Sequence, residues 1–348
     1  MRKHHGFRAA GTYGGIACAL ALTLWAGASF SNDAPSGRAA WQEKYRRPAE
    51  IPFPEGNSYS EAKFKLGRML FFDPILSGSE SRACASCHNP GLSWADGLPR
   101  AIGEKQAPLP LRTPTLLDMA WGTQLGWDGH FRNLEAVAFG PISSPTNMNM
   151  PEKVLIGRLS ANPGYVAAFH AAFGDGQITK QDVEFALATF ERSIVSGEAP
   201  FDRWIKGDQN AISDQAKRGF DLFNGKANCE ACHSGWAFTD GSFHDIGVAR
   251  DNDLGRGKLF PKSVKLLHAF KTPTLRDVAR RAPYMHDGSV ATLDAVIDLY
   301  NRGGINRPSR ADEIKPLGLT ADEKAELVAF LHTLTGKQEP VSVPTLPR

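Results

Sequence analysis

The chain has 348 residues, 42% of them hydrophobic, which is enough for two ordinary domains with their own cores. Its formal net charge is +3, and the three basic residues within 1–28, where no acidic residue occurs, account for the whole excess. The rest of the chain is therefore close to neutral. It has no broad basic field, which argues against nucleic acid as a partner.

The first 28 residues have the pattern of an export signal. Basic residues at positions 2, 3 and 8 precede an apolar run over 14–25, and positions 26–28 read Ala-Gly-Ala, an A-x-A cleavage site. A membrane anchor is the alternative, but the apolar run is short for a span. We predict a signal peptide over 1–28, a periplasmic mature protein, and membrane contact through this signal alone.

The remaining sequence predicts a mainly α protein with few strands. Residues 29–57 are predicted to be an N-terminal arm and residues 338–348 a C-terminal tail, because both are Pro-rich or polar. Apolar residues at helical spacing predict helices over 61–71, 151–172, 180–196 and 214–224. Cap and stop signals predict two more, over 292–304 and from Thr320 to about Leu334.

The four cysteines that follow the signal all lie in two copies of C-x-x-C-H, the attachment signature of c-type haem. The copies are Cys84-Ala-Ser-Cys87-His88 and Cys229-Glu-Ala-Cys232-His233. A four-cysteine zinc site or two disulfides are alternatives. Zinc needs no histidine after each pair, however, and a disulfide scaffold is not expected at this size. We predict two covalently bound haem c groups, with His88 and His233 as proximal iron ligands.

The two motifs belong to an internal duplication. Arg-Thr-Pro-Thr-Leu-Leu-Asp at 112–118 matches Lys-Thr-Pro-Thr-Leu-Arg-Asp at 271–277, and in both halves an Asp-Gly pair follows at the same distance. We therefore predict two cytochrome c-like domains, over 58–205 and 206–337, each binding one haem.

The two halves differ at a position from which a side chain could bind the haem iron as its second protein ligand. Residues 294–300 read DAVIDLY and the matching residues 135–141 read EAVAFGP, so Tyr300 corresponds to Pro141. A phenolate is a known haem ligand, which makes Tyr300 a candidate for the second iron, with Met285 and His286 as rivals. A core tyrosine with a satisfied hydroxyl is the alternative.

Proline offers no side-chain ligand, and its ring is expected to interrupt the helix at position 141. No histidine lies between His88 and His130 to supply an imidazole instead. The sequence therefore predicts an open first haem and a closed second haem, which suits catalysis better than simple electron transfer.

These motifs, together with Trp127-Asp-Gly and Ala-Pro-Tyr-Met-His-Asp-Gly at 282–288, resemble the bacterial di-haem cytochrome c peroxidase and MauG family, from about residue 60 to 336. Most of these peroxidases have methionine where Tyr300 stands, and tyrosine there is typical of the MauG-like subgroup. The resemblance implies a second haem ligated by His233 and Tyr300. It also implies a high-spin first haem on His88, and Trp127 as an electron relay between the two.

The chain departs from the family in its first-haem pocket. Val137 and Asn147 stand where the family has a glutamine and a glutamate that assist peroxide chemistry. Asn147 can orient a bound peroxide but cannot carry a proton. Either cleavage of the O–O bond is slower in this chain, or another acid, such as Glu135 or Glu152, takes the place of the glutamate. The resemblance thus makes Trp127, Asn147 and Pro141 the candidate catalytic residues.

Two further positions have an implied structural role. Arg112 replaces the asparagine that binds an inter-haem calcium in the family, which puts that calcium in doubt. We expect the Arg112 guanidinium to take its place, with the carbonyls of Arg281 and Pro283 as partners. His244 also matches a family motif and is expected to be structural near the second haem.

The expected function is that of a periplasmic di-haem oxidoreductase that uses hydrogen peroxide and, like MauG, oxidises a partner protein over long range. The first alternative is an ordinary cytochrome c peroxidase that reduces peroxide to water. A di-haem electron carrier and an oxygen-dependent haem enzyme are further alternatives. The expected protein partners are a small cytochrome c, a cupredoxin or a quinoprotein precursor.

Overall fold

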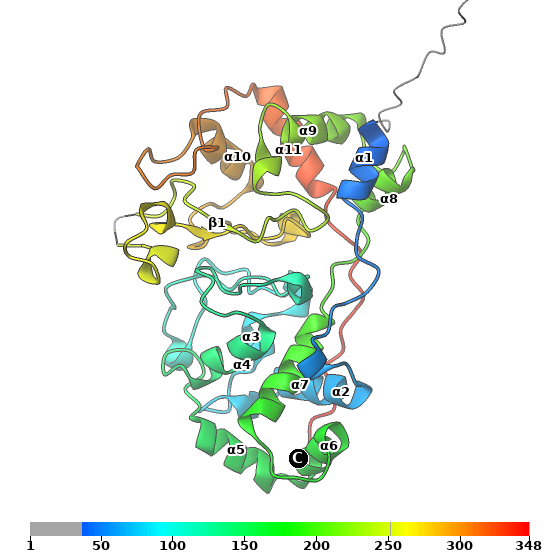
Figure 1. Cartoon of the computed structure of the whole chain (residues 1–348), viewed down its shortest axis with the longest axis vertical. Helices are drawn as coiled ribbons and strands as arrows, with labels where there is room; N and C mark the ends of the chain where they lie inside the picture. Colours follow the sequence, from blue (N-terminus) through cyan, green and yellow to red (C-terminus); the bar gives the residue numbers. More distant parts are fainter. Residues whose placement is uncertain (1–36, 251, 348) are drawn as a thin grey trace, which may run out of the picture.

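The computed structural model describes residues 37–250 and 252–347, so the predicted signal peptide lies outside the described residues. These residues form two lobes stacked along the long axis of the molecule (Figure 1). The lobes are mostly helical, which confirms the predicted fold class. Among the described helices, none is both long and apolar enough to cross a membrane.

The first lobe is organised by the packing of α2 (Glu61–Phe72) against α7 (Lys180–Arg192). Ser60 caps α2, and a capping box of Thr179 and Asp182 begins α7. Apolar residues of both helices form the core with Trp94 and Tyr165. The other helices of this lobe are α3 (Cys84–Cys87), α4 (Leu134–Ser143), α5 (Glu152–Ala161) and α6 (Pro163–Phe173).

The second lobe repeats this plan with α9 (Asp214–Asn224) packed against α11 (Ala321–His332). Its core is rich in phenylalanine, with Phe201, Phe220 and Phe330 in edge-to-face contact. The lobe also holds α1 (Gly37–Lys44), α8 (Pro200–Lys206), α10 (Leu293–Arg302) and the antiparallel two-residue strands β1 (Phe243–His244) and β2 (Phe270–Lys271).

Short 3₁₀ helices occupy much of the chain between these elements. In the first half they are Glu55–Asn57, Pro74–Leu76, Pro90–Leu92, Glu104–Gln106 and Met119–Trp121. In the second half they are Cys229–Ala231, Arg256–Lys258, Val264–Leu266 and Val278–Arg280.

A glycine permits the close helix contact in each lobe. A Cβ atom on Gly67 of α2 would lie 1.9 Å from the carbonyl oxygen of Ala186 on α7. A Cβ atom on Gly219 of α9 would likewise lie 1.9 Å from the carbonyl oxygen of Glu326 on α11. Both distances are far below any tolerated contact, so the backbones meet where a side chain is missing. The two lobes thus preserve the same helix crossing, as expected for a duplicated domain.

Three predicted helices differ from those observed. The segment 151–172 forms two helices, not one, because Asn162 caps a new helix with its side chain and Pro163 cannot continue the previous one. The helix predicted over 180–196 ends at Arg192, and that predicted to reach Leu334 ends at His332. In both cases a serine or threonine follows the last helical residue.

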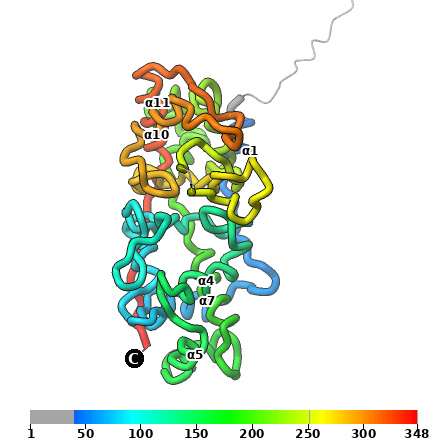
Figure 2. The backbone as a smooth tube through the Cα atoms, turned by 90° about the vertical axis from the view of Figure 1, so that its left-hand side faces the viewer, coloured from blue at the N-terminus to red at the C-terminus, as the bar shows by residue number. Residues whose placement is uncertain are grey.

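The two ends of the chain run along both lobes. Residues after α1 descend from the second lobe to the first, and residues after α11 do the same (Figures 1 and 2). Tyr45 is buried in the second-lobe core, whereas Asn57 donates to the carbonyl of Phe185 in α7. In the tail, the Ser342 hydroxyl accepts a hydrogen bond from Arg68 of α2 at 2.8 Å. Both predicted arms therefore connect the lobes.

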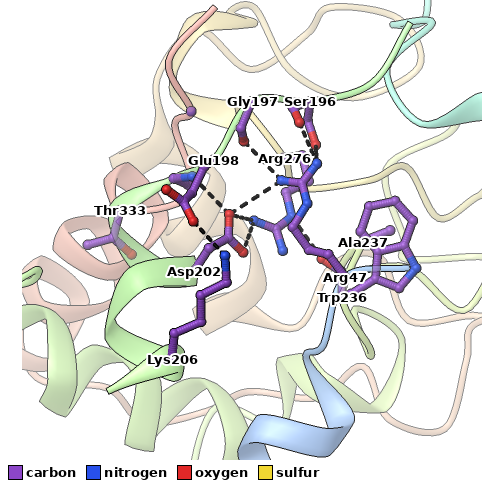
Figure 3. A network of polar contacts seen from close by, with 12 residues as sticks. Arg47, Ser196, Gly197, Glu198, Asp202, Lys206, Trp236, Ala237, Arg276 and Thr333 are labelled. Atoms are coloured by element: carbon purple, nitrogen blue, oxygen red, sulfur yellow. Dashed lines mark hydrogen bonds and ion pairs between the residues drawn. The ribbon is translucent and has the colours of Figure 1, made fainter. Parts of the chain in front are cut away.

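A buried polar cluster holds the segment 193–199, which links α7 of the first lobe to α8 of the second (Figure 3). Arg276, which is fully buried, donates two hydrogen bonds of 2.8 and 2.9 Å to the carboxylate of Asp202 in α8. Arg47 from the N-terminal segment contacts the same carboxylate at 3.3 Å and donates to the carbonyl of Gly197 at 2.9 Å. Leu117 stands at the position of Arg276 in the first half, so this cluster has no counterpart there.

Candidate functional site

A single cavity of about 930 Å³ runs through both lobes and collects nearly all the residues that the sequence analysis selected. Both cysteine motifs line it, as do Trp127, Pro141, Asn147 and Tyr300. Most of the lining surface is apolar. A large apolar chamber with two matched sets of thiols and imidazoles is the environment that two haem groups require.

The first motif occupies the short helix α3. The His88 ring places Nδ1 3.1 Å from the carbonyl oxygen of Trp94, which orients the ring and leaves Nε2 for a ligand. Burial lowers the pKa of His88, so the imidazole stays neutral, as iron ligation requires. Cys84 and Cys87 are free thiols, and burial raises the pKa of both.

The second motif repeats this geometry. Nδ1 of His233 lies 2.9 Å from the carbonyl oxygen of Phe238, and burial lowers the pKa of this histidine as well. Cys229 and Cys232 are free, and burial raises the pKa of Cys229 to about 12. The donor atoms of both motifs therefore fit covalent haem attachment with one axial histidine each.

Tyr300 faces the second motif from α10. Thr292 caps this helix and Gly303 ends it, as predicted. Burial raises the pKa of Tyr300, and the nearby thiols of Cys229 and Cys232 raise it further. The phenol is thus brought close to the second attachment site.

The rival ligands of Tyr300 also line the cavity. Nε2 of His286 is engaged with Asp253 at 2.7 Å, and its ring stacks on Phe270 at 3.6 Å. These contacts make His286 the weaker candidate for iron.

Pro141 lies inside α4, in the wall of the cavity beside the first motif. The prediction that it interrupts the helix is wrong, because α4 continues to Ser143. Proline has no backbone N–H, so one backbone hydrogen bond of the helix is missing. The loss occurs close to the end of the helix, where its cost is small. Val137, one turn earlier, and Asn147, in the loop after α4, line the same cavity.

The acids expected to replace the family's distal glutamate are not in the cavity wall. Glu135 is held by Arg192 through two hydrogen bonds of 2.7 and 2.8 Å, and Glu152 is exposed at the start of α5. Five acids do line the cavity: Asp118, Asp128, Glu191, Asp240 and Glu313. Glu191 of α7 is one that the sequence analysis missed. Its signal was present, because Val183, Leu187 and Glu191 share one helix face at intervals of four residues.

Glu191 is only 7% exposed, and its Oε2 has no hydrogen-bond partner in the described part of the chain. Burial raises its pKa to about 8, with Arg192 opposing the shift and Glu135 adding to it. A carboxyl group in this state is protonated at neutral pH. Burial therefore biases this carboxyl group in the cavity wall toward its neutral form.

Trp127 lies where the two lobes meet. Its indole Nε1 donates to the carbonyl of Arg112 at 3.0 Å, and its own carbonyl accepts from the backbone N–H of Lys271 in the second lobe at 2.8 Å. The ring centroids of Trp127 and His286 are 6.4 Å apart. The indole is therefore held by one lobe and touches the other.

The expected partners of Arg112 are confirmed. Its guanidinium donates to the carbonyl of Arg281 at 3.0 Å and to the carbonyl of Pro283. Burial and the like charge of Arg112 together lower the pKa of Arg281 to about 10. Two buried cations thus lie side by side next to Trp127.

His244 lies in β1 near the second motif and pairs with Asp240 at 2.7 Å. The hydrogen bond to Asp240 raises the pKa of His244 to about 10, with a further contribution from Cys232. Donor atoms of these three residues lie within 4.8 Å of one another, but haem attachment would consume the Cys232 thiol.

Comparison with known proteins agrees with this site. Residues 61–210 match the family model of di-haem cytochrome c peroxidase. The methylamine utilization protein MauG of Methylorubrum extorquens is 50% identical over 339 residues, covering 97% of this chain and 95% of that protein. The protein of the same name from Methylophilus methylotrophus is 45% identical, covering 91% and 95%.

Among solved structures, a MauG-like protein associated with microbial copper homeostasis superposes with a TM-score of 0.78 at 30% identity. The match covers 84% of this chain and 95% of that one. Family, length and fold agree along nearly the whole chain. The chain therefore belongs to the di-haem cytochrome c peroxidase and MauG family, and is a MauG-like haem oxidoreductase with two c-type haems.

Proposed function

We propose that this chain is a periplasmic enzyme that takes oxidising equivalents from hydrogen peroxide at its first haem and uses them to oxidise a partner protein. The observation that carries the proposal is the asymmetry of one shared cavity. Tyr300 faces the second motif, whereas Pro141 lines the wall beside the first. One iron site is then open to a small oxidant, and the other is closed for electron transfer.

The roles of the residues follow from their positions. Cys84 and Cys87 attach the first haem, and Cys229 and Cys232 attach the second. His88 and His233 would ligate the irons through Nε2, because Nδ1 of each is engaged by a backbone carbonyl. Tyr300 supplies the other ligand of the second iron. The haems supply the redox chemistry, and the protein fixes their ligation and distance.

Asn147 and Pro141 shape the open site. The Asn147 amide orients peroxide by hydrogen bonding, and Pro141 keeps the ligand position clear, since it has no donor atom. Trp127, held between the lobes, relays electrons between the two haem sites. We also propose that the guanidinium of Arg112 stands in for the calcium of related enzymes, because it already occupies two carbonyl oxygens. Stoichiometric calcium in chelator-washed protein would contradict this.

The partner is proposed from the names of the relatives. Both similar proteins are methylamine utilization proteins, which favours a quinoprotein precursor such as that of methylamine dehydrogenase as substrate. Incubation of the precursor with peroxide and this enzyme should remove hydrogen atoms from its tryptophan side chains, measured by mass spectrometry. An enzyme with Trp127→Phe is the control. A precursor left unchanged while peroxide is consumed would favour the ordinary peroxidase, with a small cytochrome c or a cupredoxin as donor.

The central test is spectroscopic. EPR of the diferric protein should give one high-spin and one low-spin haem. One equivalent of peroxide should then produce a long-lived state in which the optical bands of both haems change. Two low-spin haems that do not react with peroxide would contradict the proposal and favour an electron carrier. That alternative stays open because Val137 and Asn147 replace the residues that assist peroxide chemistry in the family. A reaction with oxygen alone would favour the oxygen-dependent enzyme.

A further inference from the structure

Glu191 is a buried acid for which the proposed chemistry has no role. It lies on the last turn of α7, one turn after Leu187, and both residues line the cavity. Cys84 of α3 lines the same cavity, and an ionised Glu191 would raise the pKa of the Cys84 thiol. Oε2 is completely buried and lacks a hydrogen-bond partner within the described residues. The side chain lines the cavity, and this oxygen lies in the protein just behind the wall of the cofactor site.

The charges around Glu191 do not compensate it. Arg192 follows it in the chain, but that guanidinium is already engaged with Glu135 of α4 through two hydrogen bonds. Asn57 adds a third hydrogen bond to Glu135 at 2.9 Å. The pair is neutral, and the Glu135 carboxylate repels a second negative charge nearby. An ionised Glu191 would therefore be a buried charge without a counterion, which is costly.

Among the described residues, the other elements packed against α7 supply no free positive charge to pair with an ionised Glu191. The Cys84 thiol on α3 becomes a neutral thioether when haem attaches. The 3₁₀ helix Met119–Trp121 carries no charged residue, and its N-cap Asp118 is a buried carboxyl whose pKa is raised by burial, so it adds no positive charge. The basic side chains of α2 and α6 are each engaged with a residue other than Glu191. The pairs are Lys63 with Asn57, Lys65 with Glu61, Arg68 with Ser342, and His170 with Asp175. Arg192 and Glu135 act on the pKa of Glu191 with opposite signs, and the charge at the first haem would be a further influence on the Glu191 proton.

We propose that Glu191 is the redox-linked proton group of the first haem. It holds one proton while the iron is ferrous and releases it to solvent when the iron loses one electron to an acceptor. Oxidation adds one positive charge at the haem, which favours the carboxylate in a poorly polarisable interior. Reduction reverses both transfers, so one electron and one proton move together. The inference rests on haem attachment at Cys84 and Cys87, as proposed above.

The test is a pH series of midpoint potentials on the di-haem protein, measured by optical spectroelectrochemistry. We compare wild type with Glu191→Gln, which keeps the shape but cannot ionise. At acid pH the first-haem potentials should agree. As pH rises, the wild-type potential should fall below that of the variant by about 59 mV per pH unit, the one-electron equivalent of a tenfold change in an equilibrium constant. The second-haem potentials should be the same in both proteins.

Glu184→Gln is the matched control, because Glu184 lies on the same helix and pairs with Lys180. It should behave as wild type. Equal pH dependence of the first-haem potential in wild type and Glu191→Gln would overturn the proposal. So would loss of that dependence in Glu184→Gln alone.

A second measurement does not depend on a variant. The redox-difference infrared spectrum of the wild type should show the carbonyl stretch of a protonated carboxylic acid in the reduced state, shifted in D₂O and lost on oxidation. The band should be missing from Glu191→Gln. A wild-type protein with both haems but no such band would refute this inference alone. A wild-type protein without haem at Cys84 would refute the proposed function instead.

Discussion

Substitution of Arg112 by asparagine should make the stability of the protein depend on calcium, because the hydrogen bonds of the guanidinium are lost. In the native protein the guanidinium donates to the buried carbonyls of Arg281 and Pro283. A hydrogen bond from a charged group stabilises a fold by about 1.5–3 kcal/mol, so the two together contribute about 3–6 kcal/mol. Relief of the repulsion from Arg281 offsets part of this. We expect the free energy of unfolding of Arg112→Asn to fall by about 2–4 kcal/mol in a chelator.

Calcium should restore that loss. The asparagine amide oxygen and the two released carbonyls are hard oxygen ligands of the kind that calcium prefers. At a free calcium concentration 100 times the dissociation constant, binding to the folded state adds about 2.7 kcal/mol. The wild type, whose carbonyls are already occupied, should not respond.

The assay is urea denaturation of the di-haem protein, followed by haem absorbance, in chelator and in millimolar calcium. Arg112→Lys is the control, since it keeps the charge but offers no planar pair of donors. It should lose stability and gain no response to calcium. The reasoning is wrong if Arg112→Asn is as stable as wild type in chelator, or if calcium stabilises the wild type equally.

Three other outcomes are expected. Tyr300→Phe and Tyr300→Met should each change the low-spin EPR signal of the second haem and leave the first-haem signal alone; a preserved wild-type spectrum in both would exclude Tyr300 as a ligand. Trp127→Phe should slow electron transfer between the haems in stopped-flow spectra after peroxide, and unchanged rates would remove the relay role. Because the pKa of Glu191 is raised from 4.5 to about 8 by folding, its proton stabilises the folded state below pH 4.5, and this stabilisation is lost between pH 4.5 and about 8. Relative to Glu191→Gln, the unfolding free energy of the reduced wild type should fall across that window by up to about 1.4 kcal/mol per pH unit in urea titrations under reducing conditions, and a parallel pair of curves would contradict the assignment.

The sequence was most informative where chemistry requires particular atoms in fixed order. Two C-x-x-C-H motifs and two Thr-Pro-Thr-Leu blocks were enough to predict duplicated cytochrome c-like domains. The packing of α2 with α7 and of α9 with α11 agrees with that prediction. Tyr300 and Pro141 were found by aligning the halves, and both line the cavity. The carbonyl partners of Arg112 came from the family resemblance.

Features that depend on tertiary packing were not predictable. Apolar periodicity continues through Asn162-Pro163, so one helix was expected where the cap and the proline make two. Pro141 sits so near the end of α4 that its missing hydrogen bond does not end the helix. The spacing of Val183, Leu187 and Glu191 indicates that Glu191 lies on the core-facing side of its helix, but it does not show which groups surround the carboxyl. Its role depends on Arg192 being engaged by Glu135, which lies on another helix, and no local pattern records that contact.

The shared cavity has a consequence for how the protein is assembled. Its walls are drawn from both cysteine motifs and from both lobes. Bound haems would fill the centre of each lobe and give its apolar lining the contacts that stabilise a core. Haem attachment is therefore a folding step as much as a loading step. We expect a chain that fails to receive either haem to remain partly open and to be removed by proteolysis before it can reach a partner.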